Sequence, residues 1–252
     1  MPRKITMQIT ANEALSAEVR RITLTGDITA QPGQFVQVAV TAAHDPYLNR
    51  PFSVHDWRDG ELTLLYRLVG RGTAILAARQ PGESVTVVGP LGRGFPMGRE
   101  HSAIIVAGGI GAAPLLFLLR RLQAAGKETA FLYGAQTAAA LVLREQFQAL
   151  ATTYAESTDD GSRGRQGQVT ELLQEVLLKQ KADIYACGPE PMLRAVAKLA
   201  AAYQCRCYLS LEARLACGVG ACLGCVVPAR DGSYLRVCVD GPVFAAEEVF
   251  AP

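Results

Sequence analysis

Four cysteines near the C-terminal end constrain this chain more than any other feature: Cys217, Cys222, Cys225 and Cys238. They follow the pattern C-x4-C-x2-C-x12-C, and the first three match the plant-type spacing in which thiolates hold a [2Fe–2S] cluster. The residues between them are mostly small (CGVGACLGC), and glycine permits the dihedral angles that a loop needs to close around the sulfides. The sequence therefore predicts that these four thiolates ligate a [2Fe–2S] cluster.

Two other uses of the cysteines fit the sequence less well. A structural zinc site usually shows two C-x2-C pairs or histidine ligands, whereas this chain has one such pair and no histidine after His101. Two disulfides would require an oxidising compartment, but the first residues (MPRKITMQITANEA) contain no apolar segment of a signal peptide. We therefore expect a cytoplasmic protein with reduced or metal-bound cysteines, and zinc remains the main alternative to the cluster.

Charge and hydropathy argue against two classes of partner. The 252 residues carry a net charge of only +2 and no long basic run, which argues against nucleic acid or an anionic membrane surface. The longest apolar run, 103–119, is rich in glycine, contains Pro114 and ends before Arg120 and Arg121. That pattern favours a buried strand leading into a helix, so we expect no membrane insertion.

The chain divides into three segments, which predicts a multi-domain protein. Residues 1–100 contain short alternating or β-branched runs, which predict a small antiparallel β-barrel: ITMQIT, RITLTG, QFVQVAV, ELTLLYRLV and SVTVVGP. Residues 101–210 alternate strand and helix, including a helix over 112–125, and predict an α/β domain with a parallel sheet. Residues 211–252 form the cysteine module.

A glycine-rich turn (VAGGIGAAP, 106–114) closes the first predicted strand of the α/β segment. A turn of this kind places the N–H groups at a helix N-terminus against a phosphate, although the pattern is not G-x-G-x-x-G. A tight turn that needs glycine only for packing is the alternative. Its position between strand and helix favours phosphate binding.

Three shorter motifs are weak when taken singly. Arg50-Pro51-Phe52-Ser53-Val54 offers a guanidinium for a pyrophosphate and a hydroxyl for a flavin ring. Gly70-Arg71-Gly72-Thr73 is a second candidate phosphate turn, in which Thr73 could serve as a helix N-cap. Cys187-Gly188-Pro189 ends a predicted strand, where ligands of parallel sheets bind, but a buried inert cysteine is an equally good interpretation.

The order of these motifs is more specific than any one of them. RPFSV, GRGT, GGIGAAP and CGP, in that order, resemble the ferredoxin–NADP reductase superfamily, which pairs an FAD-binding barrel with a nicotinamide-nucleotide domain. The C-terminal LEARLACGVGACLGCVVPA and RVCVDGPVF extend the likeness to the whole chain, which resembles the electron-transfer subunits of type B dihydroorotate dehydrogenase.

This resemblance implies a role for each motif. It assigns to FAD the residues Arg50, Pro51, Phe52, Ser53, Arg67, Leu68, Val69, Gly72 and Thr73. It assigns to the pyridine nucleotide the residues Gly108, Gly109, Gly111, Ala112, Cys187 and Gly188, with the last two near the nicotinamide. It assigns the [2Fe–2S] cluster to the four cysteines of the C-terminal module.

The resemblance also implies an electron-transfer function in pyrimidine biosynthesis, with no catalytic residue of this chain acting on dihydroorotate. A partner subunit containing FMN would oxidise dihydroorotate, and electrons would pass through the cluster and FAD to NAD⁺ in a heterotetramer with two of each subunit. The segment after the second strand of the α/β domain (GAQTAAALV) has no arginine for a 2′-phosphate, which favours NAD. Arg144, Arg163 and Arg165 follow further on. Leu215, Val219 and Leu223 would suit the subunit interface, or would pack beneath the cluster.

Three other functions remain open. The nearest is a subunit of another flavin and iron–sulfur reductase, such as the bifurcating NADH-dependent ferredoxin:NADP reductase, whose similar small subunit has aspartate at the first ligand position. Cys217 favours the dihydroorotate branch. A zinc-stabilised, nucleotide-binding redox sensor belongs to a different class. A pure scaffold would leave the glycine turns and the cysteine spacing unexplained.

Overall fold

A closed antiparallel barrel forms the first half of the computed structural model, which describes residues 2–41, 43 and 45–250. Its strands run in the order β1-β2-β5-β4-β3-β6. Alternate residues point inward, as in β6, because side chains in a strand alternate between its two faces. The predicted barrel is thereby confirmed, with strands β1 (Arg3–Ala14), β2 (Val19–Thr25), β3 (Phe35–Ala39), β4 (Arg50–Arg58), β5 (Glu61–Arg67) and β6 (Ser84–Leu91). The helix α1 (Arg71–Ala77) contributes Leu76 to the barrel core.

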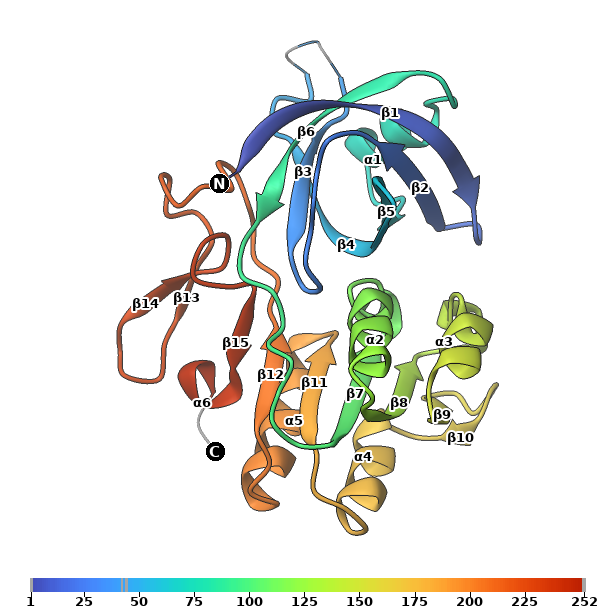
Figure 1. Ribbon diagram of the computed structural model, residues 1–252, viewed down its shortest axis with the longest axis vertical. Helices are drawn as coiled ribbons and strands as arrows, with labels where there is room; N and C mark the ends of the chain where they lie inside the picture. The colour runs from blue at the N-terminus through green and yellow to red at the C-terminus, as the bar shows by residue number, and fades with distance from the viewer. Residues whose placement is uncertain (1, 42, 44, 251–252) are drawn as a thin grey trace.

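A largely parallel sheet forms the second half, below the barrel in Figure 1. Its order is β10-β9-β8-β7-β11-β12-β15, and only the pair of β12 with β15 is antiparallel. The strands are β7 (Ser102–Gly108), β8 (Glu128–Ala135), β9 (Thr153–Thr158), β10 (Arg165–Gln166), β11 (Asp183–Cys187), β12 (Cys207–Ser210) and β15 (Val243–Ala245). The central strands are buried on both faces, which explains their continuous apolar runs.

Helices cover both faces of this sheet and make it the middle of three layers. The face that presents Ile105, Phe131 and Tyr185 packs against α2 (Leu115–Ala124) and α3 (Arg144–Leu150). The opposite face packs against α4 (Val169–Leu177), α5 (Glu190–Ala202) and α6 (Ala246–Val249). None of the helices in the described residues has both the length and the apolar character needed to cross a membrane.

The helix predicted over 112–125 differs at its start. A 3-10 turn, η1 (Gly109–Ala112), comes first, and α2 begins only at Leu115 because Pro114 is its N-cap. A second 3-10 turn, η2 (Ala138–Ala140), precedes α3. The sequence analysis did not predict α3, β9 or β10, whose apolar patterns are short and mixed with charged residues.

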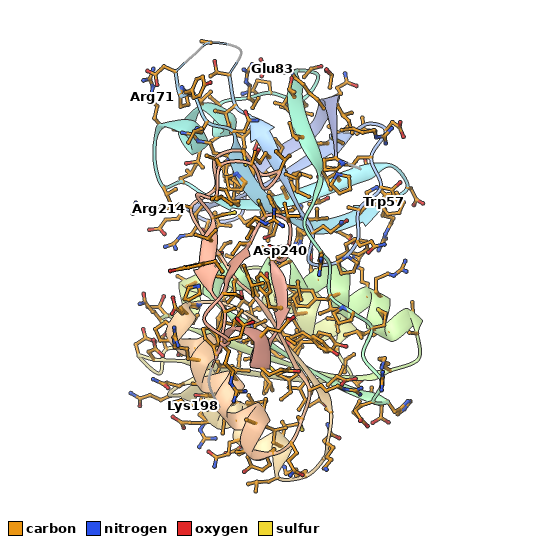
Figure 2. The ribbon with its side chains drawn as sticks, turned by 90° about the vertical axis from the view of Figure 1, so that its left-hand side faces the viewer. Trp57, Arg71, Glu83, Lys198, Arg214 and Asp240 are labelled. Carbon is orange, nitrogen blue, oxygen red and sulfur yellow. The ribbon has the colours of Figure 1, made fainter. Side chains whose placement is uncertain are left out.

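The C-terminal segment joins the two halves instead of standing apart. It contains the small hairpin of β13 (Val226–Pro228) and β14 (Tyr234–Arg236) before β15 pairs with β12. Figure 2 shows Asp240 of this segment at the level where the barrel meets the sheet. Its carboxylate accepts hydrogen bonds from the main-chain N–H of Arg236 at 2.8 Å and from Arg236 Nε at 3.0 Å. The segment that carries the cysteines is therefore fastened to the sheet by its own last strand.

Contacts between β4 and α2 fix the barrel against the sheet. The buried His55 ring lies with Nδ1 2.6 Å from the carbonyl oxygen of Ala113, and Arg120 pairs with Asp56 at 2.7 Å. Phe117 of α2 is part of the barrel core. These contacts set the position of the glycine-rich turn relative to the barrel, because Ala113 belongs to that turn and directly follows η1.

We expect acid to lower the stability of the folded chain through His55, which lies at the contact between the barrel and the sheet domain. Burial lowers the pKa of His55 from 6.5 to about 4, against the smaller raising effect of the Ala113 carbonyl. Between these two values the unfolded chain binds more protons than the folded chain, so stability is complete above about pH 6.5 and falls toward pH 4. The loss from pH 7.5 to pH 5.5 is about 1.3 kcal/mol.

Urea unfolding at those two pH values checks this expectation. Trp57 is the only tryptophan and lies two residues from His55 in β4, so its fluorescence reports on this joint. The His55→Asn variant keeps an amide nitrogen near the Ala113 carbonyl but has no group that titrates in this range. It should lose about 1.3 kcal/mol less than the natural chain over the same interval. An equal pH dependence in both proteins would rule out His55 as the source.

Candidate functional site

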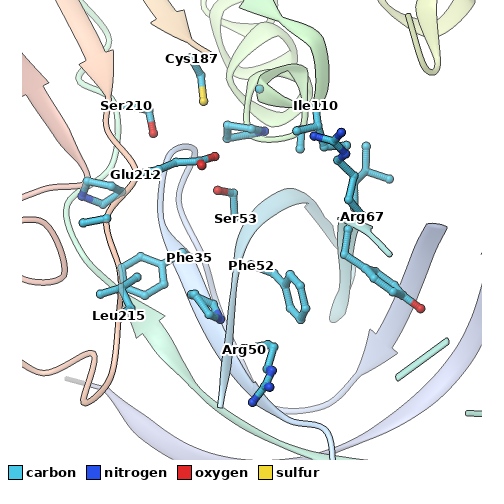
Figure 3. Close-up of a pocket in the computed structure, with 18 of the residues that line it drawn as sticks. Phe35, Arg50, Phe52, Ser53, Arg67, Ile110, Cys187, Ser210, Glu212 and Leu215 are labelled. Carbon is cyan, nitrogen blue, oxygen red and sulfur yellow. The ribbon is translucent and has the colours of Figure 1, made fainter. Parts of the chain in front are cut away.

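A cavity of about 360 Å³ lies where the barrel, the sheet and the C-terminal segment meet. Its volume is in the range of small-molecule sites. Figure 3 shows Ser53, Cys187, Ser210 and Glu212 around one space, with Phe52 and Arg50 further along the barrel. Each of the three parts of the chain therefore supplies part of the lining.

Strand β4 forms the barrel wall of this cavity. Arg50, Pro51, Phe52 and Ser53 all line it, as the sequence analysis expected. Phe35 from β3, and Leu65 and Tyr66 from β5, complete this wall and were not predicted. Their signal was weak, because apolar and aromatic residues at these strand positions also serve a barrel core.

The end of β5 and the residues just after it also contribute to the wall. Arg67 and Val69 line the cavity, whereas Leu68, between them, does not and is 37% exposed. Leu65, Tyr66 and Arg67 line it as consecutive residues, so Leu68 is the first residue of this run that turns away from the cavity. The assignment of all three residues to FAD stays a prediction.

Arg50 lies closely over the start of α1. A Cβ on Gly72 would stand 2.1 Å from Arg50 Nε, so only glycine leaves room for the guanidinium there. Thr73 lines the cavity, but it is not the N-cap that the sequence analysis expected; Gly70 is, and Thr73 is the third helical residue. Its hydroxyl accepts hydrogen bonds from the N–H groups of Val69 at 3.0 Å and Gly70 at 3.2 Å. A guanidinium held over a helix N-terminus fits the diphosphate of FAD.

The sheet wall is built from tightly opposed backbone. A Cβ on Gly111 would lie 2.4 Å from the carbonyl oxygen of Cys187, and one on Gly188 would lie 2.9 Å from the Cα of Gly108. The glycines thus let the turn after β7 touch the turn after β11. Gly111 and Cys187 line the cavity, whereas Gly108, Gly109, Ala112 and Gly188 do not. Ala112 is fully buried, and Gly109 has φ +52° with open space around it.

Cys187 is a neutral thiol in this wall. It is buried, and desolvation, aided by the Glu212 carboxylate, raises its pKa to about 12. A thiol with that pKa is a poor nucleophile at neutral pH. Its burial in this wall suits close packing against a ligand better than covalent chemistry.

Sequence reasoning missed the last residue of β12 and the residues that follow it. Ser210, Leu211, Glu212, Ala213 and Leu215 all line the cavity. The sequence could have indicated this part of the site, because the segment lies at the C-terminal end of a parallel strand, where ligands bind. It was hidden by the assignment of everything after 210 to the cysteine module.

The cysteine loop brings its thiols together in two pairs. Cys217 and Cys222 are hydrogen-bonded neighbours, with the Cys222 N–H 3.4 Å from Cys217 Sγ, and the Cys225 and Cys238 thiols also contact one another. In the described residues, no three or more His, Cys, Asp or Glu side chains converge as the ligands of a single metal ion do. Tetrahedral zinc needs four donors around one ion, whereas [2Fe–2S] shares four thiolates between two irons. The neighbouring thiol pairs are compatible with a cluster in which each pair holds one iron.

Backbone N–H groups in the same loop suit an anionic centre. The N–H of Val219 makes the largest contribution in lowering the pKa of Cys217 to about 6, which favours the thiolate. Gly218, Gly220 and Leu223 have positive φ angles of 71°, 80° and 56°, which turn the loop around its sulfurs. All seven cysteines are free of disulfides. The residues present therefore fit a cluster.

Short covalent and hydrogen-bonded paths connect the cysteine loop to the cavity. Val237 lines the cavity, precedes Cys238 and donates its N–H to the Cys225 carbonyl at 3.1 Å. The buried Gln37 of β3 donates from Nε2 to the carbonyl of Ala216 at 3.0 Å, next to Cys217. A cluster here would thus be held beside the barrel wall of the cavity.

Comparison with known proteins agrees with this arrangement. A family model described as the oxidoreductase NAD-binding domain matches residues 105–198. Another, described as the iron–sulfur cluster binding domain of dihydroorotate dehydrogenase B, matches residues 212–250.

Solved structures share the fold. The NADH-dependent reduced ferredoxin–NADP oxidoreductase, solved in a study of flavin-based electron bifurcation, matches with a TM-score of 0.86 and 28% identity, over 96% of this chain and 89% of that one. The ferredoxin reductase in carbazole 1,9a-dioxygenase matches with a TM-score of 0.68 and 20% identity, over 81% of this chain and 67% of that one. The second likeness concerns the fold alone.

Curated relatives match over almost their full length. The dihydroorotate dehydrogenase B (NAD(+)) electron transfer subunit of Geobacillus kaustophilus (strain HTA426) is 44% identical, over 96% of this chain and 97% of the relative. The subunit of the same name from Caldanaerobacter subterraneus subsp. tengcongensis is 36% identical, over 98% of both chains. With its barrel, sheet and paired cysteines in place, the chain belongs to the family of dihydroorotate dehydrogenase B electron transfer subunits.

Proposed function

We propose that this chain carries electrons from a dihydroorotate-oxidising catalytic subunit to NAD⁺, with a [2Fe–2S] cluster and FAD as its two redox groups. The observation that carries the proposal is the shared cavity. One wall comes from the barrel motif around Ser53, a second from the glycine turn and Cys187, and a third from the segment that leads into the cysteines. A flavin in this cavity has the nucleotide site on one side and the cluster site on the other.

The two groups supply complementary chemistry when bound: FAD exchanges a hydride with NAD(H) and single electrons with the cluster, which handles one electron at a time. The chain's own residues bind and orient. Arg50 and the N-terminus of α1 hold the diphosphate of FAD, and Ser53 offers a hydroxyl to its ring. The glycine turn after β7 receives the nucleotide's pyrophosphate. The buried Cys187 excludes water where the two rings would meet.

The catalytic partner, which we propose contains FMN, is expected to dock on the exposed face of the cysteine loop. Val219 and Leu223 are 51% and 59% exposed beside the cluster ligands. Leu215, which the sequence analysis grouped with them, lines the cavity instead. We propose a heterotetramer with two of each subunit, located in the cytoplasm, where the seven free cysteines would stay reduced or bound to metal.

Introducing negative charges on this face should weaken the complex while the chain keeps its iron and FAD. In the double variant Val219→Asp and Leu223→Asp, each apolar contact would be replaced by a desolvated carboxylate, so affinity for the catalytic subunit should fall roughly tenfold or more. Calorimetric titration of the two purified subunits measures the change. Leu178→Asp, at a residue that is 70% exposed at the end of α4, is the control and should bind normally. If the double variant binds the catalytic subunit with normal affinity and contains full iron and FAD, the interface does not include this face.

A subunit of a bifurcating ferredoxin–NADP reductase is the second candidate, because the structure of such an enzyme matches this chain with a TM-score of 0.86. Cys217 in the first ligand position and the relatives at 36–44% identity favour the dihydroorotate branch. The preferred catalytic partner decides between them: dihydroorotate should reduce the flavin of this chain only when the dihydroorotate-oxidising subunit is present.

An absorption spectrum of the anaerobically purified chain, with iron, zinc and flavin assays, is the direct test. One FAD and two irons per chain, with bleaching on addition of NADH, are expected. Zinc without flavin would overturn the proposal and favour the nucleotide-binding redox sensor.

A further inference from the structure

A charged pair closes the turn that carries the fourth cysteine of the loop. Arg236 donates from Nε to Asp240 Oδ2 at 3.0 Å and from Nη2 to Asp240 Oδ1 at 3.1 Å. The Arg236 carbonyl completes the turn by accepting the N–H of Asp240 at 2.8 Å and of Gly241 at 3.3 Å. Cys238 lies inside this turn, so the pair fixes the guanidinium close to one of the four cysteines.

The guanidinium also lies against the cysteine loop. Neither hydrogen bond to Asp240 uses Nη1, and a Cβ built on Gly220 would lie 3.2 Å from that nitrogen. Gly220 in turn donates its N–H to the Cys238 sulfur. Across the β13–β14 hairpin, Arg236 is paired with Val226, the residue after Cys225. Arg236 therefore stands between the two cysteines of this thiol pair.

A fixed positive charge at this position favours the reduced state of a cluster. Asp240 raises the pKa of Arg236 through its hydrogen bonds and its charge, and the Cys238 and Cys225 sulfurs add smaller effects in the same direction. A [2Fe–2S] cluster gains one negative charge on reduction, and nearby charge is one of the factors that set its potential. The Arg236 side chain is 39% exposed, so solvent and salt weaken this effect without removing it.

We propose that the charge of Arg236 raises the reduction potential of the cluster, and that Asp240 is the positioning residue that holds the guanidinium beside the cysteines. Arg236 acts through its charge alone and is not a ligand. The inference rests on the proposed function and adds to it a residue that sets how readily this chain accepts an electron from the catalytic subunit.

Redox titration of the anaerobically purified chain, followed by absorption and electron paramagnetic resonance, tests the inference. Arg236→Gln should weaken cluster reduction roughly threefold, which is a potential lower by about 30 mV for one electron. The shift should shrink in about 1 M salt. Arg236→Lys keeps the charge and should recover most of the potential. Asp240→Asn removes the opposing charge and should raise the potential, whereas damage to the turn alone would shift both neutral variants in the same direction.

Arg230→Gln is the matched control, because it removes an exposed arginine from the turn between β13 and β14 of the same hairpin. It should leave the potential unchanged. A natural potential in Arg236→Gln, or an unchanged or lower potential in Asp240→Asn, would overturn the inference. If Arg236→Gln loses its iron, the direction of the shift in Asp240→Asn decides the question. Failure of the proposed function would be distinct, because the natural chain would then contain no two-iron cluster to titrate.

Discussion

The Cys222→Ser variant is expected to lose electron transfer from the catalytic subunit by at least roughly 100-fold while its FAD remains reducible by NADH. Cys222 is the exposed member of its thiol pair, and its Sγ accepts the Gly224 N–H at 3.4 Å. Serine offers a harder, more basic ligand and a shorter bond, so iron should be retained poorly. Under the proposed function, hydride exchange with NADH would use the other side of the cavity and would not need the cluster.

Two assays on one preparation separate these steps. Dihydroorotate-driven NAD⁺ reduction by the assembled complex measures the route through the cluster, and anaerobic bleaching of the flavin by NADH measures the other route. Cys205→Ser is the control, because Cys205 hydrogen-bonds to the Tyr203 carbonyl after α5, outside the cysteine loop. Full iron content and normal coupled turnover in Cys222→Ser would refute its assignment as a ligand.

The second large effect is expected from Gly111→Ala. The added Cβ would stand 2.4 Å from the Cys187 carbonyl oxygen and 2.7 Å from the Gly188 Cα. Both neighbours are backbone atoms, which cannot rotate away as a side chain can, so the turns after β7 and β11 must separate. Since the nicotinamide must lie within about 3.5 Å of the flavin for transfer, NADH-driven flavin reduction should fall roughly 100-fold.

Rapid-mixing measurements of flavin bleaching by NADH check this expectation. Flavin content should change little, because Gly111 lies in the sheet wall of the cavity and the proposed FAD site is on the barrel wall. Gly126→Ala, in the turn before β8, controls for general destabilisation: nothing lies within 4 Å of its Cβ, but its φ of +72° strains any other residue. A Gly111→Ala protein that is reduced at the natural rate would show that the contact between the two turns is not required.

The sequence predicted most of the fold because its patterns are local. The local hydrophobic pattern of a strand indicates which of its residues are buried. The barrel strands show an alternating pattern, and β7, β8 and β11 show continuous apolar runs. The paired cysteines were predictable for the same reason, since ligand spacing is a property of one short loop. β15 was not predictable, because three residues (Val243–Ala245) show no period and become a strand only when β12 offers its edge.

The site was predicted less completely than the fold. Three residues that line the cavity lie in recognisable sequence motifs: Arg50, Ser53 and Cys187. Glu212 lies within a run that reads as the approach to the cysteines, and only the closing of β15 onto β12 brings that run against the barrel. Contacts between domains leave no hydrophobic periodicity in either segment of the sequence, so a single sequence does not reveal them.

The pairing of β15 with β12 has a consequence for the kinetics of the assembled enzyme. Many electron carriers swing on a tether between donor and acceptor, and viscous solvents slow them. Here the cysteine-bearing segment is anchored at both ends, by the continuous chain after β12 and by β15 at the sheet edge. We therefore expect the cysteine loop to stay in place during electron transfer, so added glycerol should slow the docking of the subunits but leave electron transfer within the docked complex unchanged.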